Sequence, residues 1–314
     1  MTRLQALIVH NTSAGDGSVD PATVRTAIEA QGYVVAYRTI DDDGWRDEIR
    51  HTDVAVAIGG DGTLRRVFLE VVDSDVPILV VAAGTGNNIA RALGMPVENP
   101  IAHISDLNTS DTITFDVPVM TIGRRRELFV ETVGGGVFAE FLAMRESEEQ
   151  TTGVGTALRH LKDLVTTAEP QTWSIEGDGV DLSGDFIAVE VMNINETGSN
   201  VMLAPRASVN DGLLDLVLVG PTDRDDLLAA IDRRIVGETS VRLDLPSRQC
   251  RSVRLGVPTA TPLRRDDQVE QAFHEPTITI EMTGHAVRLV VPRPRPRRDV
   301  RQPTVAATPP GMTT

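Results

Sequence analysis

The sequence predicts an α/β fold in which a parallel sheet covered by helices is followed by a β-rich second domain. Along the first 95 residues, continuous apolar runs alternate with amphipathic segments of helical periodicity, which is typical of a parallel sheet buried on both faces. After residue 96 the pattern changes to short β-rich runs separated by turn signals. The length of 314 residues also exceeds that of most single domains, so two domains are expected.

The elements of the first part follow from their apolar patterns. Strands are predicted for residues 4–10, 33–40, 53–60 and 77–84. Helices are predicted for residues 21–32, 63–73 and 87–94, the first with Pro21 near its start and Gly32 just past its last turn. Parallel sheets bind ligands beyond the carboxyl ends of their strands. Three of these ends carry glycine and small polar residues, HNTSAGDG, GGDGT and GTGNN, and we expect them to meet at one edge of the sheet.

The second part is predicted from shorter runs. Strands are expected within residues 111–123, 127–136, 172–179, 185–195, 213–220 and 250–257, and helices at 156–168 and 224–237. From Pro292 onward the chain is rich in proline and arginine, which favours disorder. The expected organisation is therefore a first domain over 1–115, a second over 116–292 and a disordered tail over 293–314.

Charge and composition exclude several classes of function. The net charge of −15 argues against nucleic-acid binding and against tight docking on an anionic membrane, so at most peripheral membrane contact is expected. Lys162 is the only lysine, which excludes a P-loop nucleotide site. Cys250 is the only cysteine, which excludes an intramolecular disulfide and a cysteine-based zinc site. No apolar run has the length of a membrane span or of a signal peptide, so we expect a cytoplasmic protein.

An acidic residue interrupts the second of the three glycine-rich segments. In the stretch VAIGGDGTLRRVF, Asp61 lies between Gly60 and Gly62, where a predicted strand meets a predicted helix. Glycine allows a ligand to approach the backbone closely, and the free amides of a helix N-terminus suit phosphate. A carboxylate opposes phosphate binding unless a metal lies between them or the acid handles a proton. The alternative interpretation is a tight turn with an exposed aspartate.

Together these motifs resemble the diacylglycerol kinase catalytic-domain superfamily, which includes bacterial lipid kinases, sphingosine kinases and, more distantly, NAD kinases. The resemblance covers residues 4–292 and rests on residues 11–15, 59–63 and 84–96, on Asp116 and on the stretch APRASVNDGLLDLVLV at 204–219. It implies an N-terminal Rossmann-like nucleotide domain and a C-terminal β-sandwich-like substrate domain. It also implies transfer of the γ-phosphoryl group of ATP, with Mg²⁺, to a hydroxyl group.

The resemblance further assigns residues to the site. Asp61 lies where Mg²⁺ and the transferred phosphoryl group meet, and Asp116 belongs to the same charge network, because this reaction depends on positioning and charge neutralisation. Nucleotide contacts fall on Asn11, Thr12, Ser13, Ala14, Gly15, Thr39, Gly59, Gly60, Gly62, Thr63 and Thr85. Ser208, Asp211 and the carbonyl of Leu213 match a second, structural Mg²⁺ site, for which the alternative is a plain Asn-Asp-Gly turn.

The sequence departs from the family at the catalytic base. The family's Asp-Gly-Glu triplet, whose Glu accepts the hydroxyl proton, falls on Asp266, Asp267 and Gln268. Gln268 cannot accept a proton at neutral pH. Either Asp266 or Glu270 supplies the base, or the register shifts, or catalysis is weak.

Three further positions differ from the family pattern. Asn88 replaces a common Asp, while Glu131 and Phe138 stand where Asn and Asp are usual. Apolar residues of the second domain line a substrate groove or form the buried face of a helix, namely Phe138, Phe141, Leu142 and Met144.

Three functions therefore stay open. The first is an ATP- and Mg²⁺-dependent kinase of a lipid alcohol such as diacylglycerol. The second is a kinase of a soluble hydroxyl compound or of NAD, and the third is a nucleotide-binding pseudokinase, which Gln268 favours. The expected partners are ATP and a lipid alcohol, without nucleic acid, and a homodimer is left open.

Overall fold

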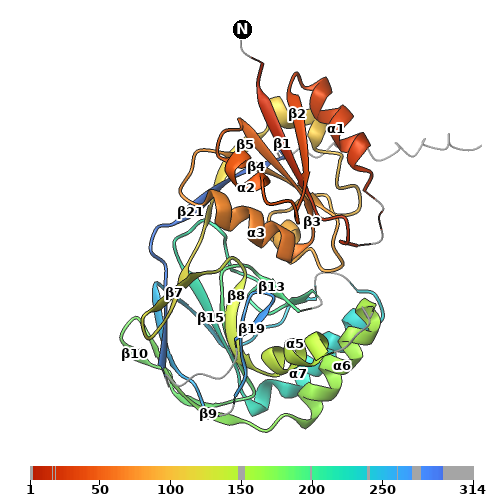
Figure 1. Ribbon diagram of the computed structural model, residues 1–314. Coiled ribbons are helices and arrows are strands. Elements are labelled where there is room, and N and C mark those ends of the chain that lie inside the picture. Colours follow the sequence, from red (N-terminus) through yellow and green to blue (C-terminus); the bar gives the residue numbers. More distant parts are fainter. Residues whose placement is uncertain are drawn as a thin grey trace, which may run out of the picture.

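The computed structural model describes residues 3–15, 17, 19–147, 153–198, 200–238, 241–259, 261–270 and 277–292. Figure 1 shows two parts, with the N-terminal sheet and its helices in red and orange above a β-rich part in green and blue. The residues expected to form a disordered tail, 293–314, lie outside the described residues.

The N-terminal sheet has the strand order β2-β1-β3-β4-β21-β5. Its strands are β1 (Gln5–His10), β2 (Val34–Thr39), β3 (Val54–Gly59), β4 (Pro77–Ala82), β5 (Asp111–Asp116) and β21 (Ala286–Val291). The four strands predicted from the first 95 residues pair in parallel. The last described strand, β21, is parallel to β4 and antiparallel to β5, so the expected second domain, 116–292, contributes its final strand to the first sheet (Figure 1).

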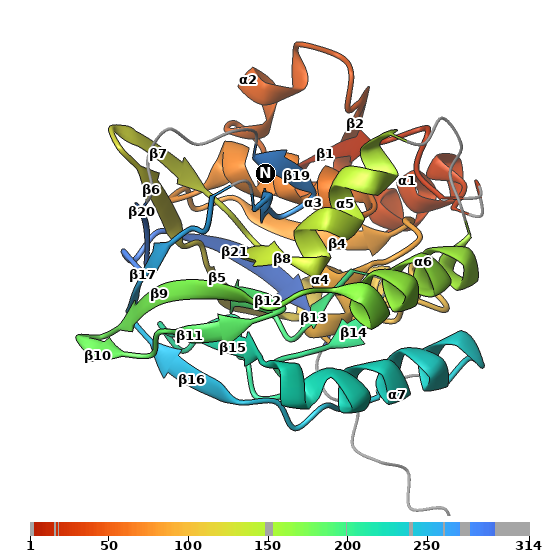
Figure 2. The ribbon, with the colours of Figure 1, turned by 90° about the horizontal axis from the view of Figure 1, so that it is seen from below.

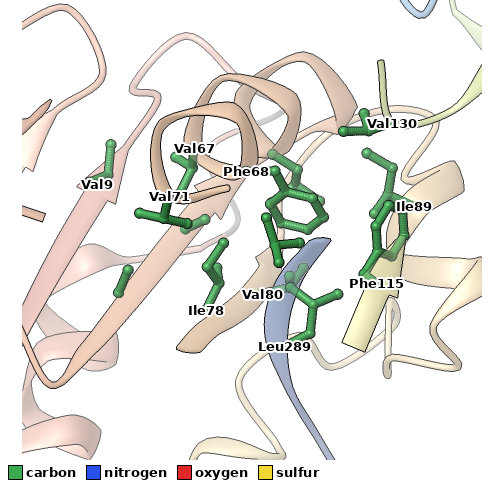
Figure 3. Close-up of a cluster of buried hydrophobic side chains, with 14 of the residues drawn as sticks. Val9, Val67, Phe68, Val71, Ile78, Val80, Ile89, Phe115, Val130 and Leu289 are labelled. Carbon is green, nitrogen blue, oxygen red and sulfur yellow. The ribbon is translucent and has the colours of Figure 1, made fainter. Parts of the chain in front are cut away.

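Helices cover both faces of this sheet. They are α1 (Pro21–Ala30), α2 (Trp45–Ile49), α3 (Asp61–Val71) and α4 (Asn88–Ala92), with a short 3-10 helix over Ile104–Thr109. On one face, Val24 and Ile28 of α1 pack with Ile8 and Leu79. On the other, α3 packs its apolar stripe against the strands, as Figure 3 shows for Val67, Phe68, Val71, Ile78, Val80 and Leu289. Two-sided burial explains why these strands are continuously apolar.

The start of α3 differs from the prediction in a way that matters for the site. The helix begins at Asp61 rather than at residue 63, because the carbonyl of Gly60 accepts hydrogen bonds from the amides of Thr63 and Leu64, both at 3.0 Å. Asp61 therefore lies in the first helical turn.

The second part is built on two antiparallel sheets that enclose one apolar core. The first has the order β10-β9-β17-β20-β6-β7, with β11 beside β9, and the second has the order β16-β15-β12-β8-β18-β19. Met120, Trp173 and Val253 of the first sheet pack with Val191 and Leu216 of the second. This is the predicted β-sandwich-like arrangement.

The strand bounds of this part are as follows. The first sheet holds β6 (Val119–Ile122), β7 (Arg125–Leu128), β9 (Gln171–Gly177), β10 (Val180–Asp181), β11 (Gly184–Phe186), β17 (Ser252–Gly256) and β20 (Thr277–Glu281). The second holds β8 (Thr132–Gly136), β12 (Ala188–Met192), β15 (Leu214–Val219), β16 (Ser247–Cys250), β18 (Leu263–Arg265) and β19 (Gln268–Glu270). A small separate hairpin is formed by β13 (Glu196–Thr197) and β14 (Val201–Met202).

Three helices pack together against the second sheet (Figure 2). They are α5 (Val137–Ser147), α6 (Val154–Thr167) and α7 (Arg224–Ile235), the last preceded by a 3-10 turn over Pro221–Asp223. Phe138 and Phe141 are buried on α5, and Met144 packs partly buried beside them, which agrees with the buried-helix alternative. In the part of the chain that the structure describes, no helix combines the length and apolar character needed to cross a bilayer.

Candidate functional site

The three glycine-rich loops lie side by side, as predicted, because β1, β3 and β4 are neighbours in the sheet. They enclose a pocket of about 490 Å³, lined by Asn11, Ser13, Ala14, Gly15, Gly60, Gly62, Thr63, Arg65, Arg66, Gly84, Thr85 and Asp267. A second pocket of about 770 Å³ adjoins it along the start of α1 and shares Gly15, Gly84 and Thr85. Three predicted nucleotide contacts, Thr12, Thr39 and Gly59, are not among the lining residues of either pocket.

The loops touch through their backbones, which explains their glycines. Gly15 has φ +67°, and a Cβ there would lie 2.1 Å from the carbonyl oxygen of Ala83. A Cβ on Gly84 would lie 2.4 Å from the Cα of Gly60. Since real side chains cannot approach so closely, these positions bring the three loops within reach of one ligand.

Asp61 joins the second loop to the third. Its Oδ2 accepts a hydrogen bond from the backbone amide of Asn88, and its Oδ1 accepts one from that of Ile89, both at 3.0 Å. Burial raises the pKa of Asp61, although these amides oppose the shift and the charge of Asp267 adds to it. Asp61 is half-buried and its carboxylate caps α4, so it is not the exposed acid of a plain turn.

The first loop is held to the second by a side-chain network. Asn11 Nδ2 donates a hydrogen bond to Thr63 Oγ1 at 3.0 Å, and Asn11 Oδ1 accepts hydrogen bonds from the amide and hydroxyl of Ser13 at 3.1 and 2.8 Å. Gly59 serves the same contact, because a Cβ there would lie 2.4 Å from Thr63 Oγ1. Thr39 ends β2, and its amide donates to Asp42.

A turn of the β-sandwich reaches over this pocket. Asp267, between β18 and β19, lies with Oδ1 2.9 Å from Nε of Arg65 on α3. A Cβ on Gly62 would lie 2.5 Å from Oδ2 of Asp267. The family triplet falls on this turn, but the sequence does not predict Asp267 or Arg65 as a site residue. The approach of the turn to α3 is a contact between distant parts of the chain, which local patterns do not reveal.

The neighbours of Asp267 have different surroundings. Asp266 has φ +54°, and its buried carboxylate accepts hydrogen bonds from the backbone amides of residues 130–132 at 2.7–3.2 Å. Burial raises the pKa of Asp266 to about 6 against the opposing effect of these amides.

Gln268 is exposed, and its Oε1 accepts a hydrogen bond from Arg265 at 2.9 Å. Glu270 is ion-paired with Arg265 at 2.9 Å and with Arg125 at 2.5 Å.

Glu131 brings another buried carboxyl group toward Asp61. Its Oε2 accepts a hydrogen bond from Asn88 Nδ2 at 3.3 Å. Burial raises the pKa of Glu131 well above its ordinary value, and the charges of Asp61 and Asp266 add to this shift. Sequence reasoning registered Glu131 only as a departure from the family, and that departure was the one available signal for a functional role.

Asp116 and the predicted structural metal site come together at another turn. Asp116 Oδ2 accepts a hydrogen bond from the Gly212 amide at 2.8 Å, and burial raises the pKa of Asp116. Asp211 accepts hydrogen bonds from the Leu213 amide at 3.0 Å and from Gln249 at 3.3 Å, while Ser208 donates to Asn210. Among the described residues, no three His, Cys, Asp or Glu side chains converge as a metal-binding group, and metal binding here stays a prediction.

Models of two protein families match this chain. Residues 5–120 match the diacylglycerol kinase catalytic domain, and residues 145–290 match the YegS C-terminal NAD kinase beta sandwich-like domain. A crystal structure of a diacylglycerol kinase from Bacillus anthracis is similar with a TM-score of 0.64 and 17% identity, over 93% of this chain and 98% of that one. At this identity the likeness bears on the fold alone.

Similar sequences carry related names. The chain is 30% identical to a diacylglycerol kinase of Bacillus subtilis over 60% of this chain and 62% of that protein. It is 30% identical to a Pseudomonas aeruginosa protein named "Probable lipid kinase YegS-like" over 70% and 72% of the two chains. A protein of the same name from Alcanivorax borkumensis is 27% identical over 93% of this chain and 98% of that protein. The match to the Bacillus subtilis protein thus spans less than two thirds of its length.

Proposed function

Because this chain belongs to the family of diacylglycerol kinases and YegS-like lipid kinases, we propose that it transfers the γ-phosphoryl group of ATP, with Mg²⁺, to the hydroxyl group of a lipid such as diacylglycerol. The observation that carries this proposal is the position of Asp61 at the N-terminus of α3, between loops that touch through glycine backbones. Such backbones admit phosphate, and a helix N-terminus favours its charge.

We assign the nucleotide to the pocket of about 490 Å³. Its lining contains eight of the residues proposed as nucleotide contacts, namely Asn11, Ser13, Ala14, Gly15, Gly60, Gly62, Thr63 and Thr85. Their backbone amides and hydroxyl groups are suited to phosphate oxygens. Thr12, Thr39 and Gly59 are proposed to support this loop arrangement rather than to line the pocket.

The chemistry of Asp61 fits a Mg²⁺ ion. Mg²⁺ prefers oxygen ligands and is held in kinases by one or two carboxylates together with the substrate phosphates. An ionised carboxylate has about four acceptor positions, of which Asn88 and Ile89 occupy two in Asp61. When bound, Mg²⁺ neutralises charge that develops on the phosphates. Asp61 would hold the metal, while its contacts to α4 fix the orientation of the carboxylate.

The hydroxyl proton needs an acceptor near Asp61. Gln268 carries no charge, and Glu270 is ion-paired with two arginines. Asp267 is ion-paired with Arg65, which leaves the buried carboxyl groups of Asp266 and Glu131 as candidates. Both have raised pKa values through burial. The carboxylate of Asp116 contacts the Gly212 turn. Asp116 therefore stays a proposed catalytic residue on the resemblance alone.

Transfer to a panel of acceptors tests this function. The purified chain is incubated with γ-labelled ATP, Mg²⁺ and either diacylglycerol in mixed micelles, NAD or glycerol, with Asp61→Asn as the control. Label in a diacylglycerol-derived phospholipid supports the lipid kinase. Label in NAD or in glycerol would support a kinase of a soluble compound. ATP binding without transfer to any acceptor supports the pseudokinase, which the exposed and uncharged Gln268 favours.

A further inference from the structure

Arg65 places a mostly buried positive charge on the wall of the pocket of about 490 Å³. It lies on α3 one turn after Asp61, and its side chain is only 12% exposed. Nε of Arg65 has no hydrogen bond of acceptable geometry to any described residue, although it forms an ion pair with Asp267 at 2.9 Å. A buried guanidinium without a full set of acceptors is costly, so this group is suited to a further oxygen ligand.

The partner of Arg65 comes from a distant part of the chain. Asp267 belongs to the turn between β18 and β19, and its side chain is 45% exposed at the pocket, where it lies against Gly62. Arginine binds carboxylate and phosphate oxygens with the same planar set of donors. The Asp267 carboxylate therefore stands at a position where a phosphate group would find the same partner.

No other cation of this pocket is equally available. The lining contains two charged donors, Arg65 and Arg66. Arg66 donates a hydrogen bond to the carbonyl of Ile40 at 2.9 Å and lies 3.7 Å from Asp41, both outside the lining. The only lysine, Lys162, is ion-paired with Asp232 of α7. Of the two cations in this lining, Arg65 is thus the one whose charged partner, Asp267, lies in the pocket itself.

We propose that the Arg65 guanidinium binds a phosphate group of the nucleotide in competition with the Asp267 carboxylate. This inference rests on the proposed function, since it requires a nucleotide in the pocket. Nucleotide binding would exchange a contact between the β-sandwich and α3 for a contact between α3 and phosphate. The bound nucleotide would in this way loosen the 266–267 turn from the N-terminal part.

Calorimetric titration without Mg²⁺ measures the separate effects of Arg65 and Asp267 on ATP affinity. ATP and adenosine are titrated into the full chain, Arg65→Gln, Asp267→Asn and the control Arg233→Gln, which removes an exposed charge of α7 that pairs with Glu238, three residues beyond the end of that helix. Arg65→Gln should weaken ATP binding about 10- to 100-fold, the usual effect of a lost charge-assisted hydrogen bond, and leave adenosine binding unchanged. Asp267→Asn should tighten ATP binding, and Arg233→Gln should leave it unchanged.

Several results would overturn the inference. One is an ATP affinity of Arg65→Gln equal to that of wild type, and another is a loss of ATP affinity in this variant that is matched by an equal loss of adenosine affinity. The third is ATP binding by Asp267→Asn that is unchanged from wild type or weaker. If a thermal unfolding measurement shows that Arg65→Gln is not folded, the Asp267→Asn titration decides alone. This substitution removes a competitor of the phosphate and none of the groups proposed to donate to it. A wild-type chain that binds no ATP, with or without Mg²⁺, would instead overturn the proposed function itself.

Discussion

Asp61 and Asn88 are joined across two loops, because Asp61 Oδ2 accepts a hydrogen bond from the backbone amide of Asn88 at 3.0 Å. The side chain of Asn88 continues the connection, since its Nδ2 donates to Glu131 Oε2 and its Oδ1 accepts from Asn200 Nδ2 at 2.9 Å. A continuous hydrogen-bonded path therefore runs from the GGDGT loop to the β-sandwich. Rigid positioning of this kind is what phosphoryl transfer requires.

The contact between the second and third loops predicts the effect of Gly84→Ala. A Cβ on Gly84 would lie 2.4 Å from the Cα of Gly60, so the loops must move apart and ATP affinity should fall. Gly44→Ala is the matched control, because a Cβ on Gly44 meets no atom within 4 Å. Calorimetric titration of ATP measures both. Wild-type ATP affinity in Gly84→Ala would show that this loop contact does not shape the nucleotide site.

The raised pKa of Asp266 predicts a pH dependence of stability. The pKa is about 6 in the folded chain and near 3.8 without the fold, so the folded state binds more protons between these values. The resulting stabilisation is present below pH 4 and is lost as the pH rises through about 6, by about 3 kcal/mol at 1.36 kcal/mol per pH unit.

Asp266→Asn should remove this contribution. Asparagine tolerates the positive φ of +54° and can still accept a hydrogen bond from the amides of residues 130–132. Urea unfolding between pH 4 and 7.5 should show a steeper fall in the free energy of unfolding for wild type than for the variant. Parallel curves would contradict the assignment of the pKa to Asp266.

Gln268→Glu should not produce a fast kinase. The side chain is exposed and bound to Arg265, and a glutamate there would strengthen that contact rather than face Asp61. The change in turnover should stay well below the gain of about 100- to 10,000-fold that a general base contributes. Steady-state kinetics with the best acceptor measures it, and a gain within that range would restore the base position implied by the family triplet.

Glu131→Gln tests the buried carboxyl group as a proton acceptor. Glutamine keeps an oxygen for the hydrogen bond from Asn88 Nδ2, so the fold and ATP affinity should change little. Turnover should fall by about 100-fold or more if Glu131 accepts the proton. Single-turnover rates with bound ATP isolate this step, and an unchanged rate would leave Asp266 as the remaining candidate.

The N-terminal sheet could be predicted because its signals are local. The runs 53–60 and 77–84 are apolar and end in glycine motifs, and parallel strands place their carboxyl ends at one edge. The return of β21 could not be predicted, since a short apolar run such as AVRLVV suits an edge or a central position in either sheet.

The site could be predicted only where it is formed by motifs. Asp61 and its glycines are contiguous in the chain, whereas Arg65 and Asp267 are about 200 residues apart and meet through the packing of the sandwich against α3. Asp266 illustrates the same limit. Its type suggested a base, but the three amides that surround it depend on how β8 lies beside β18.

The most direct test of the account is the transfer rate of Asp61→Asn compared with wild type. Asparagine retains one acceptor oxygen for the α4 amides, so the free energy of unfolding should fall by only about 1 kcal/mol. Loss of the charge that would hold Mg²⁺ against the phosphates should lower transfer to diacylglycerol about 100- to 1,000-fold. A folded Asp61→Asn chain that transfers phosphate at the wild-type rate would contradict the central role of Asp61.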